Sequence, residues 1–176
     1  MKSTLVLLAH PNLLKSRINR ALVESVKSLP HVTVHDLYET YPHFVVDVKR
    51  EQELLLAHER IVFQHPFYWY SSPALLKEWQ DQVLEYGFAY GQNGVALQGK
   101  EFLSVVSAGG DAEDYRRDGQ NYFSVEELLA PFQQTVRLCK MLWQKPIIFH
   151  GVLDWDDKAI AVAAEKYRSV LTEDSS

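Results

Sequence analysis

Short apolar runs alternate with longer segments of helical periodicity along almost the whole chain. Runs rich in Val, Ile, Leu and Phe without polar alternation are typical of strands that are covered on both faces, as in a parallel sheet. The expected strands occupy residues 4–9, 32–37, 60–64, 101–107 and 146–150. The expected helices occupy residues 16–29, 49–58, 73–84, 124–142 and 157–171.

This strand–helix order predicts a doubly wound α/β fold, because each parallel connection needs a crossover that packs a helix onto the sheet. For a chain of 176 residues, the flavodoxin-like strand order 2-1-3-4-5 is favoured. We therefore expect a three-layer sandwich around a five-stranded parallel sheet, with residues 1–176 as one domain and residues 173–176 as a tail. Ser124 and Glu127 match a capping box, and Pro131 should kink or restart its helix.

Charge and composition exclude several classes of protein. The 18 basic and 23 acidic residues give a net charge of −5, which disfavours nucleic-acid binding because phosphate contacts need clustered Lys and Arg. The single cysteine, Cys139, excludes an intrachain disulfide, and its apolar helical setting predicts a buried thiol. The first apolar run leads into His10-Pro11 and not into a cleavage site, so we expect a cytoplasmic protein without a membrane span.

In an open α/β sheet, ligands bind beyond the carboxyl ends of the strands, at the switch point between the first and third strands. The first loop there leads into a helix with Ser16 near its N-cap, and a helix N-terminus suits a phosphate. His10 and Asn19 could add donors, and Lys15 or Arg17 could add charge. Alternatively, Ser16 only caps the helix. The chain contains neither a dinucleotide-binding glycine fingerprint nor a P-loop motif.

The loop after the third strand carries four consecutive aromatic residues, 67–70, between Pro66 and Pro73. Such a cluster indicates either a flat aromatic ligand or a protein interface. Gly109-Gly110, after the fourth strand, fits either a tight turn or a close backbone approach to a ligand. The following loop, 111–123, carries Tyr115 and is long for a compact domain, as functional loops often are.

Three histidines, His10, His65 and His150, each follow an expected strand. No carboxylate occupies a matching position, so hydrogen-bonding roles are favoured over a metal site. We expect the remaining histidines at solvent-facing or boundary positions: His31, His35, His43 and His58.

Several of these motifs together resemble a known family. Ala9-His10-Pro11 with Ser16 and Asn19, the aromatic segment 65–70 running into 73–79, and Gly109-Gly110 are similar to the flavodoxin-like NAD(P)H:quinone oxidoreductases. Segment 32–38, Tyr41-Pro42 and Asp47 resemble the ancillary, regulatory subunits of glutathione-regulated potassium-efflux (Kef) systems most closely. The resemblance covers nearly the whole chain.

The resemblance implies FMN at the switch point, NADPH or NADH as hydride donor, and two-electron, ping-pong transfer to a quinone or related electrophilic small molecule. It implies Tyr115 as the catalytic residue and no metal ligand. It implies these cofactor-binding residues: His10, Ser16, Arg17, Ile18, Asn19, Pro66, Phe67, Tyr68, Trp69, Tyr70, Ser107, Ala108, Gly109 and Gly110.

The resemblance also implies a homodimer that joins a potassium-efflux membrane protein at the cytoplasmic face of the inner membrane. Three alternatives stay open. The first is a purely regulatory flavin-binding subunit with negligible turnover, and the second is a general NAD(P)H-dependent flavin reductase. The third is a plain flavodoxin-type electron carrier, which is disfavoured by the aromatic loop and by the lack of a phosphate-loop glycine between Pro11 and Ser16.

Overall fold

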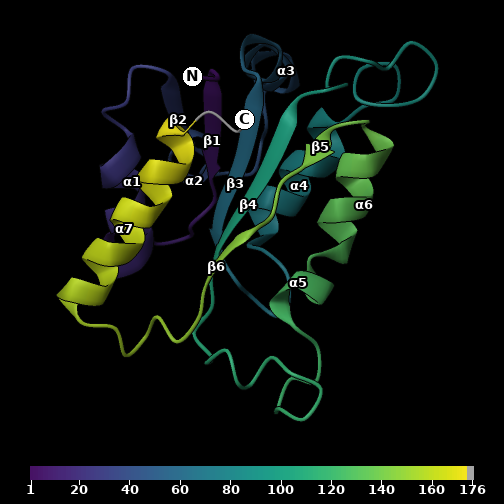
Figure 1. The fold of residues 1–176 in the computed structure, drawn as a ribbon. Coiled ribbons are helices and arrows are strands. Elements are labelled where there is room, and N and C mark those ends of the chain that lie inside the picture. Colours follow the sequence, from purple (N-terminus) through teal and green to yellow (C-terminus); the bar gives the residue numbers. More distant parts are fainter. Residues whose placement is uncertain (174–176) are drawn as a thin grey trace.

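The computed structural model describes residues 1–173 and places a central sheet between two layers of helices (Figure 1). The strand order is β2-β1-β3-β4-β5, β6 also pairs with β4, and all these pairings are parallel. The expected flavodoxin-like order 2-1-3-4-5 is therefore confirmed. The strands are β1 (Thr4–Leu8), β2 (Val32–Asp36), β3 (Arg60–Pro66), β4 (Glu101–Ser107), β5 (Leu142–Trp143) and β6 (Ile147–Phe149).

The fifth position of the sheet differs from expectation, because two short strands share it. Leu142 pairs with Glu101 at the start of β4, whereas Ile147 pairs with Val105 nearer its end. Pro146 lies between the two short strands, and proline has no N–H to donate to a ladder. The expected helix over 124–142 accordingly ends at Leu138, and Leu142 belongs to the sheet.

The helices cover both faces of the sheet. Helices α1 (Arg17–Val26) and α7 (Asp157–Thr172) pack on the face to which Val6 contributes. Helices α3 (Val48–Ala57), α4 (Ala74–Val83) and α6 (Ala130–Leu138) pack on the other face, with Leu5 and Leu7. Successive side chains of β1 therefore point into the hydrophobic cores on opposite faces of the sheet. Shorter elements are η1 (Leu13–Lys15), α2 (Leu37–Thr40) and α5 (Val125–Leu128).

Local signals in the sequence set several helix ends. Ser124 Oγ accepts from the Glu127 N–H at 3.1 Å, and Glu127 Oε2 accepts from the Ser124 N–H at 2.8 Å, which confirms the capping box. A new helix, α6, starts at Ala130 with Pro131 in its first turn, as expected. Pro73 occupies the N-cap of α4, one residue before the helix.

Two histidines are buried where boundary positions were expected. His58 bonds Thr33 and a backbone carbonyl, and His35 Nε2 lies 2.8 Å from Glu51 Oε1.

Glu51 is fully buried and also accepts from Tyr41 Oη at 2.5 Å and Trp79 Nε1 at 2.7 Å. Burial raises the pKa of the Glu51 carboxyl, but these hydrogen bonds outweigh it and leave the pKa below its ordinary value. The network therefore keeps a carboxylate inside the core.

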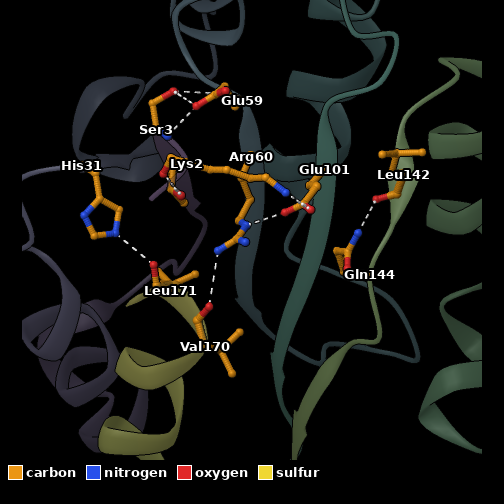
Figure 2. Close-up of polar contacts among 11 residues, drawn as sticks. Lys2, Ser3, His31, Glu59, Arg60, Glu101, Leu142, Gln144, Val170 and Leu171 are labelled. Atoms are coloured by element: carbon orange, nitrogen blue, oxygen red, sulfur yellow. Dashed lines mark hydrogen bonds and ion pairs between the residues drawn. The ribbon is translucent and has the colours of Figure 1, made fainter. Parts of the chain in front are cut away.

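Polar contacts join neighbouring elements at the amino-terminal ends of the strands (Figure 2). Arg60, at the start of β3, donates to Glu101 Oε2 at 2.8 Å and to the Val170 carbonyl at 3.3 Å. Glu101 also pairs with Lys2, and His31 Nε2 lies 2.9 Å from the carbonyl of Leu171. These contacts tie α7 to this end of the sheet.

Cys139 is buried, as expected, and burial raises the pKa of its thiol. Within residues 1–173, no helix combines the length and apolar character needed to cross a bilayer. The last three residues of the expected tail, 174–176, lie outside the described residues.

Candidate functional site

A cleft of about 580 Å³ opens where β1, β3 and β4 end, which is the predicted switch point. Its volume lies within the range of small-molecule and cofactor pockets. Ten of the fourteen expected cofactor residues line it: His10, Ser16, Arg17, Ile18, Asn19, Pro66, Phe67, Tyr68, Ser107 and Gly109. The cleft is also lined by Asn12, Lys15, Val152 and Leu153, but not by Trp69, Tyr70, Ala108 or Gly110.

The N-terminus of α1 forms one end of the cleft. Ser16 is the N-cap of this helix, since its Oγ accepts from the Asn19 N–H at 3.2 Å. Asn19 Nδ2 bonds Ser16 Oγ at 3.2 Å and Ser107 Oγ, from the end of β4, at 2.9 Å. Asn19 Oδ1 is buried and has no hydrogen-bond partner among the described residues. This end therefore combines free helix N–H groups with an unused acceptor.

His10 lies beside this helix end. Its Nδ1 accepts from the Asn12 N–H at 3.0 Å, so in the neutral ring the proton sits on Nε2. Burial lowers the pKa of His10, and its own backbone offsets this only in part. At neutral pH, His10 therefore offers one hydrogen-bond donor, Nε2.

Arg17 lines the cleft, but its guanidinium is engaged with the loop between β6 and α7 and with the first residue of α7. Nη1 donates to the Trp155 carbonyl at 2.7 Å, and Nη2 pairs with Asp157 Oδ1 at 2.7 Å. The same stretch of chain contributes Val152 and Leu153 to the cleft. Sequence reasoning missed both residues. Following the loop after the last strand past Gly151 would have found them.

The aromatic segment forms a tight turn that separates its members. Tyr68 and Ser71 pair as an antiparallel bridge, and Trp69 and Tyr70 between them take φ values of 47° and 62°. This left-handed conformation is rare for bulky residues. Phe67 and Tyr68 line the cleft, whereas Trp69 is 91% exposed and Tyr70 Oη donates to Asn121 Oδ1 at 3.1 Å. The segment thus offers side chains both to a ligand and to an interface.

The glycine pair permits close packing without a left-handed backbone. A Cβ at Gly109 would lie 3.1 Å from Leu153 Cδ1, and one at Gly110 would lie 3.2 Å from Tyr115 Cε2. The Tyr115 ring also packs against Phe67, with ring centroids 5.9 Å apart. Burial, followed by the neighbouring Tyr70 and Asp114, raises the pKa of Tyr115 above its ordinary value, so its hydroxyl is protonated at neutral pH. Tyr115 therefore packs beside the cleft wall rather than lining the cleft.

The three histidines that were expected after strands have different surroundings, and His65 lies within β3. His65 is fully buried and stacks on Phe132 with ring centroids 5.7 Å apart, and His150 packs against Tyr115 at 5.5 Å. Among residues 1–173, no group of three or more His, Cys, Asp or Glu side chains could hold a metal ion.

The family model described as the flavodoxin-like fold matches residues 2–171. A relative from Bacillus subtilis (strain 168), named uncharacterized NAD(P)H oxidoreductase YrkL, is 45% identical, and the match covers 93% of this chain and 94% of the relative. The ancillary protein KefG of the glutathione-regulated potassium-efflux system from Pectobacterium atrosepticum is 49% identical, with 96% and 92% covered. These matches confirm the resemblance to NAD(P)H oxidoreductases and Kef ancillary proteins.

Solved structures share the fold along nearly their whole length. General stress protein 14 from Treponema denticola, in complex with FMN, has a TM-score of 0.91 and 39% identity, with 97% of this chain and 98% of that one covered. An NADPH-quinone reductase from P. pentosaceus has a TM-score of 0.90 and 32% identity, with 98% and 99% covered. A structure named a thermophilic tryptophan halogenase, from Streptomycin violaceusniger, has a TM-score of 0.94 and 45% identity, with 97% and 99% covered.

Proposed function

Because this chain belongs to the flavodoxin-like fold family, we propose that it is an NAD(P)H:quinone oxidoreductase with FMN in the cleft at the switch point. Relatives of similar length named NAD(P)H oxidoreductase and NADPH-quinone reductase, and the FMN complex of a third, support this function. We do not propose halogenase activity for this chain, because a relative with the same 45% identity is named an NAD(P)H oxidoreductase. We also propose that residues 1–176 form a single flavin-binding domain.

The observation that carries the proposal is the chemistry of the cleft walls. The α1 N-terminus, capped by Ser16, suits a phosphate, and the unpartnered Asn19 Oδ1 can accept a hydrogen bond from a ribityl hydroxyl. Phe67 and Tyr68 offer aromatic surface for a flat ring, and Gly109 leaves the backbone open to it. A polar end next to an aromatic end matches the two halves of FMN.

Bound FMN would supply the two-electron redox chemistry, taking up a hydride and later releasing it. The protein orients the reactants and excludes water, for which Val152 and Leu153 are placed on the cleft wall. Tyr115 is the proposed catalytic residue, since its protonated hydroxyl can donate a hydrogen bond to the bound nicotinamide or quinone. We propose a ping-pong order of the two half-reactions, because the nicotinamide donor and the quinone acceptor would both need the same face of the flavin ring.

The test begins with the purified protein. Bound ligand released by heat should have the mass of FMN, and NADPH or NADH should reduce the flavin in a stopped-flow instrument before any quinone is added. Quinone should then reoxidise it in a separate step. Recovery of FAD would contradict the cofactor. If the protein binds flavin but neither half-reaction turns over, a purely regulatory subunit is supported instead. Turnover with free flavin and not with quinone would support a flavin reductase.

We further propose a regulatory role at a potassium-efflux transporter, for which the KefG relative is the support. The chain would then work in the cytoplasm, held at the inner membrane by its partner. Trp69 is 91% exposed on the aromatic turn and is available for such a contact. Adding the protein to membranes that contain a Kef transporter should raise potassium efflux, and Trp69→Ser should reduce this effect. Unchanged efflux would contradict the role.

A twofold homodimer is also proposed. Loops that border the cleft carry large exposed apolar side chains, including Leu14 at 83% and Leu153 at 78% exposure. A second copy would cover them, and a twofold pair is the commonest closed assembly. Light scattering at micromolar concentration should give twice the mass of the chain, and a monomer would contradict the proposal.

A further inference from the structure

We infer that Arg17 is a positioning residue that holds the loop between β6 and α7 against the cofactor cleft, and is not a ligand of the FMN phosphate. The inference rests on the proposed function, because it concerns how the FMN cleft is built. The Arg17 guanidinium bonds the Trp155 carbonyl and the Asp157 carboxylate.

The inner end of this loop, residues 150–156, is tied to the end of the sheet. The Gly151 N–H donates to the Gly110 carbonyl at 2.9 Å, and the Val152 N–H donates to the Ala108 carbonyl at 3.2 Å. Gly151 has a φ of 64°, and a Cβ there would lie 2.3 Å from Asp111 Oδ1. The backbone at this end is therefore fixed beside the glycine pair.

The outer end of the loop is held by Arg17. Its Nη1 donates to the Trp155 carbonyl and its Nη2 pairs with Asp157 Oδ1, each at 2.7 Å. One guanidinium thus bonds two points on the chain, and a planar group with several donors is suited to this. The Trp155 ring packs edge-on against Phe149 of β6, with centroids 5.9 Å apart.

Between these two fixed ends lie the residues that form the cleft wall. Val152 and Leu153 line the cleft, and the Leu153 side chain approaches the position of a Cβ on Gly109. Leu153 is 78% exposed, so burial alone does not keep it in place. The bonds from Arg17 therefore help to hold this wall beside the cleft, together with the Asp154 N–H, which donates to the Gly151 carbonyl at 3.2 Å.

The alternative role, direct binding of the phosphate, makes a different demand on Arg17. A phosphate ligand acts through charge, and lysine is also an effective phosphate binder. The bonds to Trp155 and Asp157 instead need two donors in a fixed geometry, which lysine does not offer. Arg17→Lys therefore separates charge from geometry, and riboflavin, which is FMN without the phosphate, separates the two ends of the ligand.

The experiment measures dissociation constants of FMN and riboflavin for the apo-protein, by quenching of flavin fluorescence. Arg17→Lys and Arg17→Ala should each weaken both ligands by the same factor, about threefold to tenfold, since exposed charge-assisted bonds are of modest strength. Asp157→Asn should also weaken the binding of both FMN and riboflavin. Weakening of FMN alone, with Arg17→Lys close to wild type, would overturn the inference.

Hydrogen exchange of the apo-protein supplies a second readout that a general loss of stability would not produce. In both Arg17 variants, exchange should rise within residues 150–156 and stay unchanged in β1 and β3, with the urea midpoint unaltered. Lys15→Ala is the matched control, because it removes a neighbouring cation from the same cleft and should leave exchange of 150–156 unchanged. Unaltered exchange in the Arg17 variants would overturn the inference. If wild-type protein bound neither flavin, the proposed function would fail, while exchange would still decide the role of Arg17.

Discussion

His65 should make the fold sensitive to acid, and replacing it should remove part of that sensitivity. The side chain is fully buried, its Nδ1 lies 2.9 Å from the Pro66 carbonyl, and its Nε2 has no partner among the described residues. Burial lowers the pKa of His65 from 6.5 to about 4, and the Pro66 carbonyl offsets this only in part. The folded chain therefore keeps the ring neutral at pH values where the unfolded chain would protonate it.

The sign and size of the effect follow from this difference. Below pH 6.5 the unfolded state binds a proton that the folded state does not, so stability falls as the pH falls, until the folded pKa near 4 is reached. The free energy of unfolding should lose about 3 kcal/mol over this window, at about 1.4 kcal/mol per pKa unit. Above pH 7 the group should contribute no pH dependence.

His65→Leu removes the titrating ring and keeps an apolar side chain against Phe132. Urea unfolding, followed by tryptophan fluorescence between pH 7.5 and pH 4.5, gives the free energy of unfolding for each protein. The wild-type protein should lose about 2–3 kcal/mol more than the variant across this range. His43→Gln, at an exposed position, is the matched control and should parallel the wild type. Parallel curves for wild type and His65→Leu would refute the reasoning.

Three further predictions concern the cleft and the loops beside it. The double substitution Ser16→Ala and Asn19→Ala should weaken FMN binding by about 1–3 kcal/mol through lost hydrogen bonds, as measured by fluorescence titration. Unchanged FMN affinity in a folded variant would mean that the phosphate binds elsewhere. Tyr115→Phe should lower kcat about tenfold or more with full FMN content if the hydroxyl is catalytic, whereas unchanged stopped-flow rates in both half-reactions would remove that role. Gly151→Ala should destabilise the fold by more than about 1 kcal/mol in urea unfolding, because of its φ of 64° and the nearby Asp111; wild-type stability would contradict this strain.

Local and periodic features of the sequence were sufficient to predict the architecture. The unbroken apolar runs predicted buried parallel strands, and the strand–helix order led to the order 2-1-3-4-5, because crossover rules leave few arrangements. The Ser124 capping box and the restart at Pro131 were predictable because both depend on residues close together in the chain. The position of the cleft followed from topology alone, since parallel strands all end at one edge.

The direction of individual side chains was decided only by tertiary structure. The aromatic run 67–70 is uniform as a sequence, but the left-handed turn at Trp69 and Tyr70 sends two of its rings away from the cleft. Arg17 belongs to the expected phosphate loop, yet Asp157, distant in the chain, attracts its guanidinium. The assignment of these residues to FMN stays a prediction. The buried Glu51 carboxylate likewise depends on hydrogen-bond donors from separate elements. No local sequence pattern predicts these donors, because they come together only when the chain has packed.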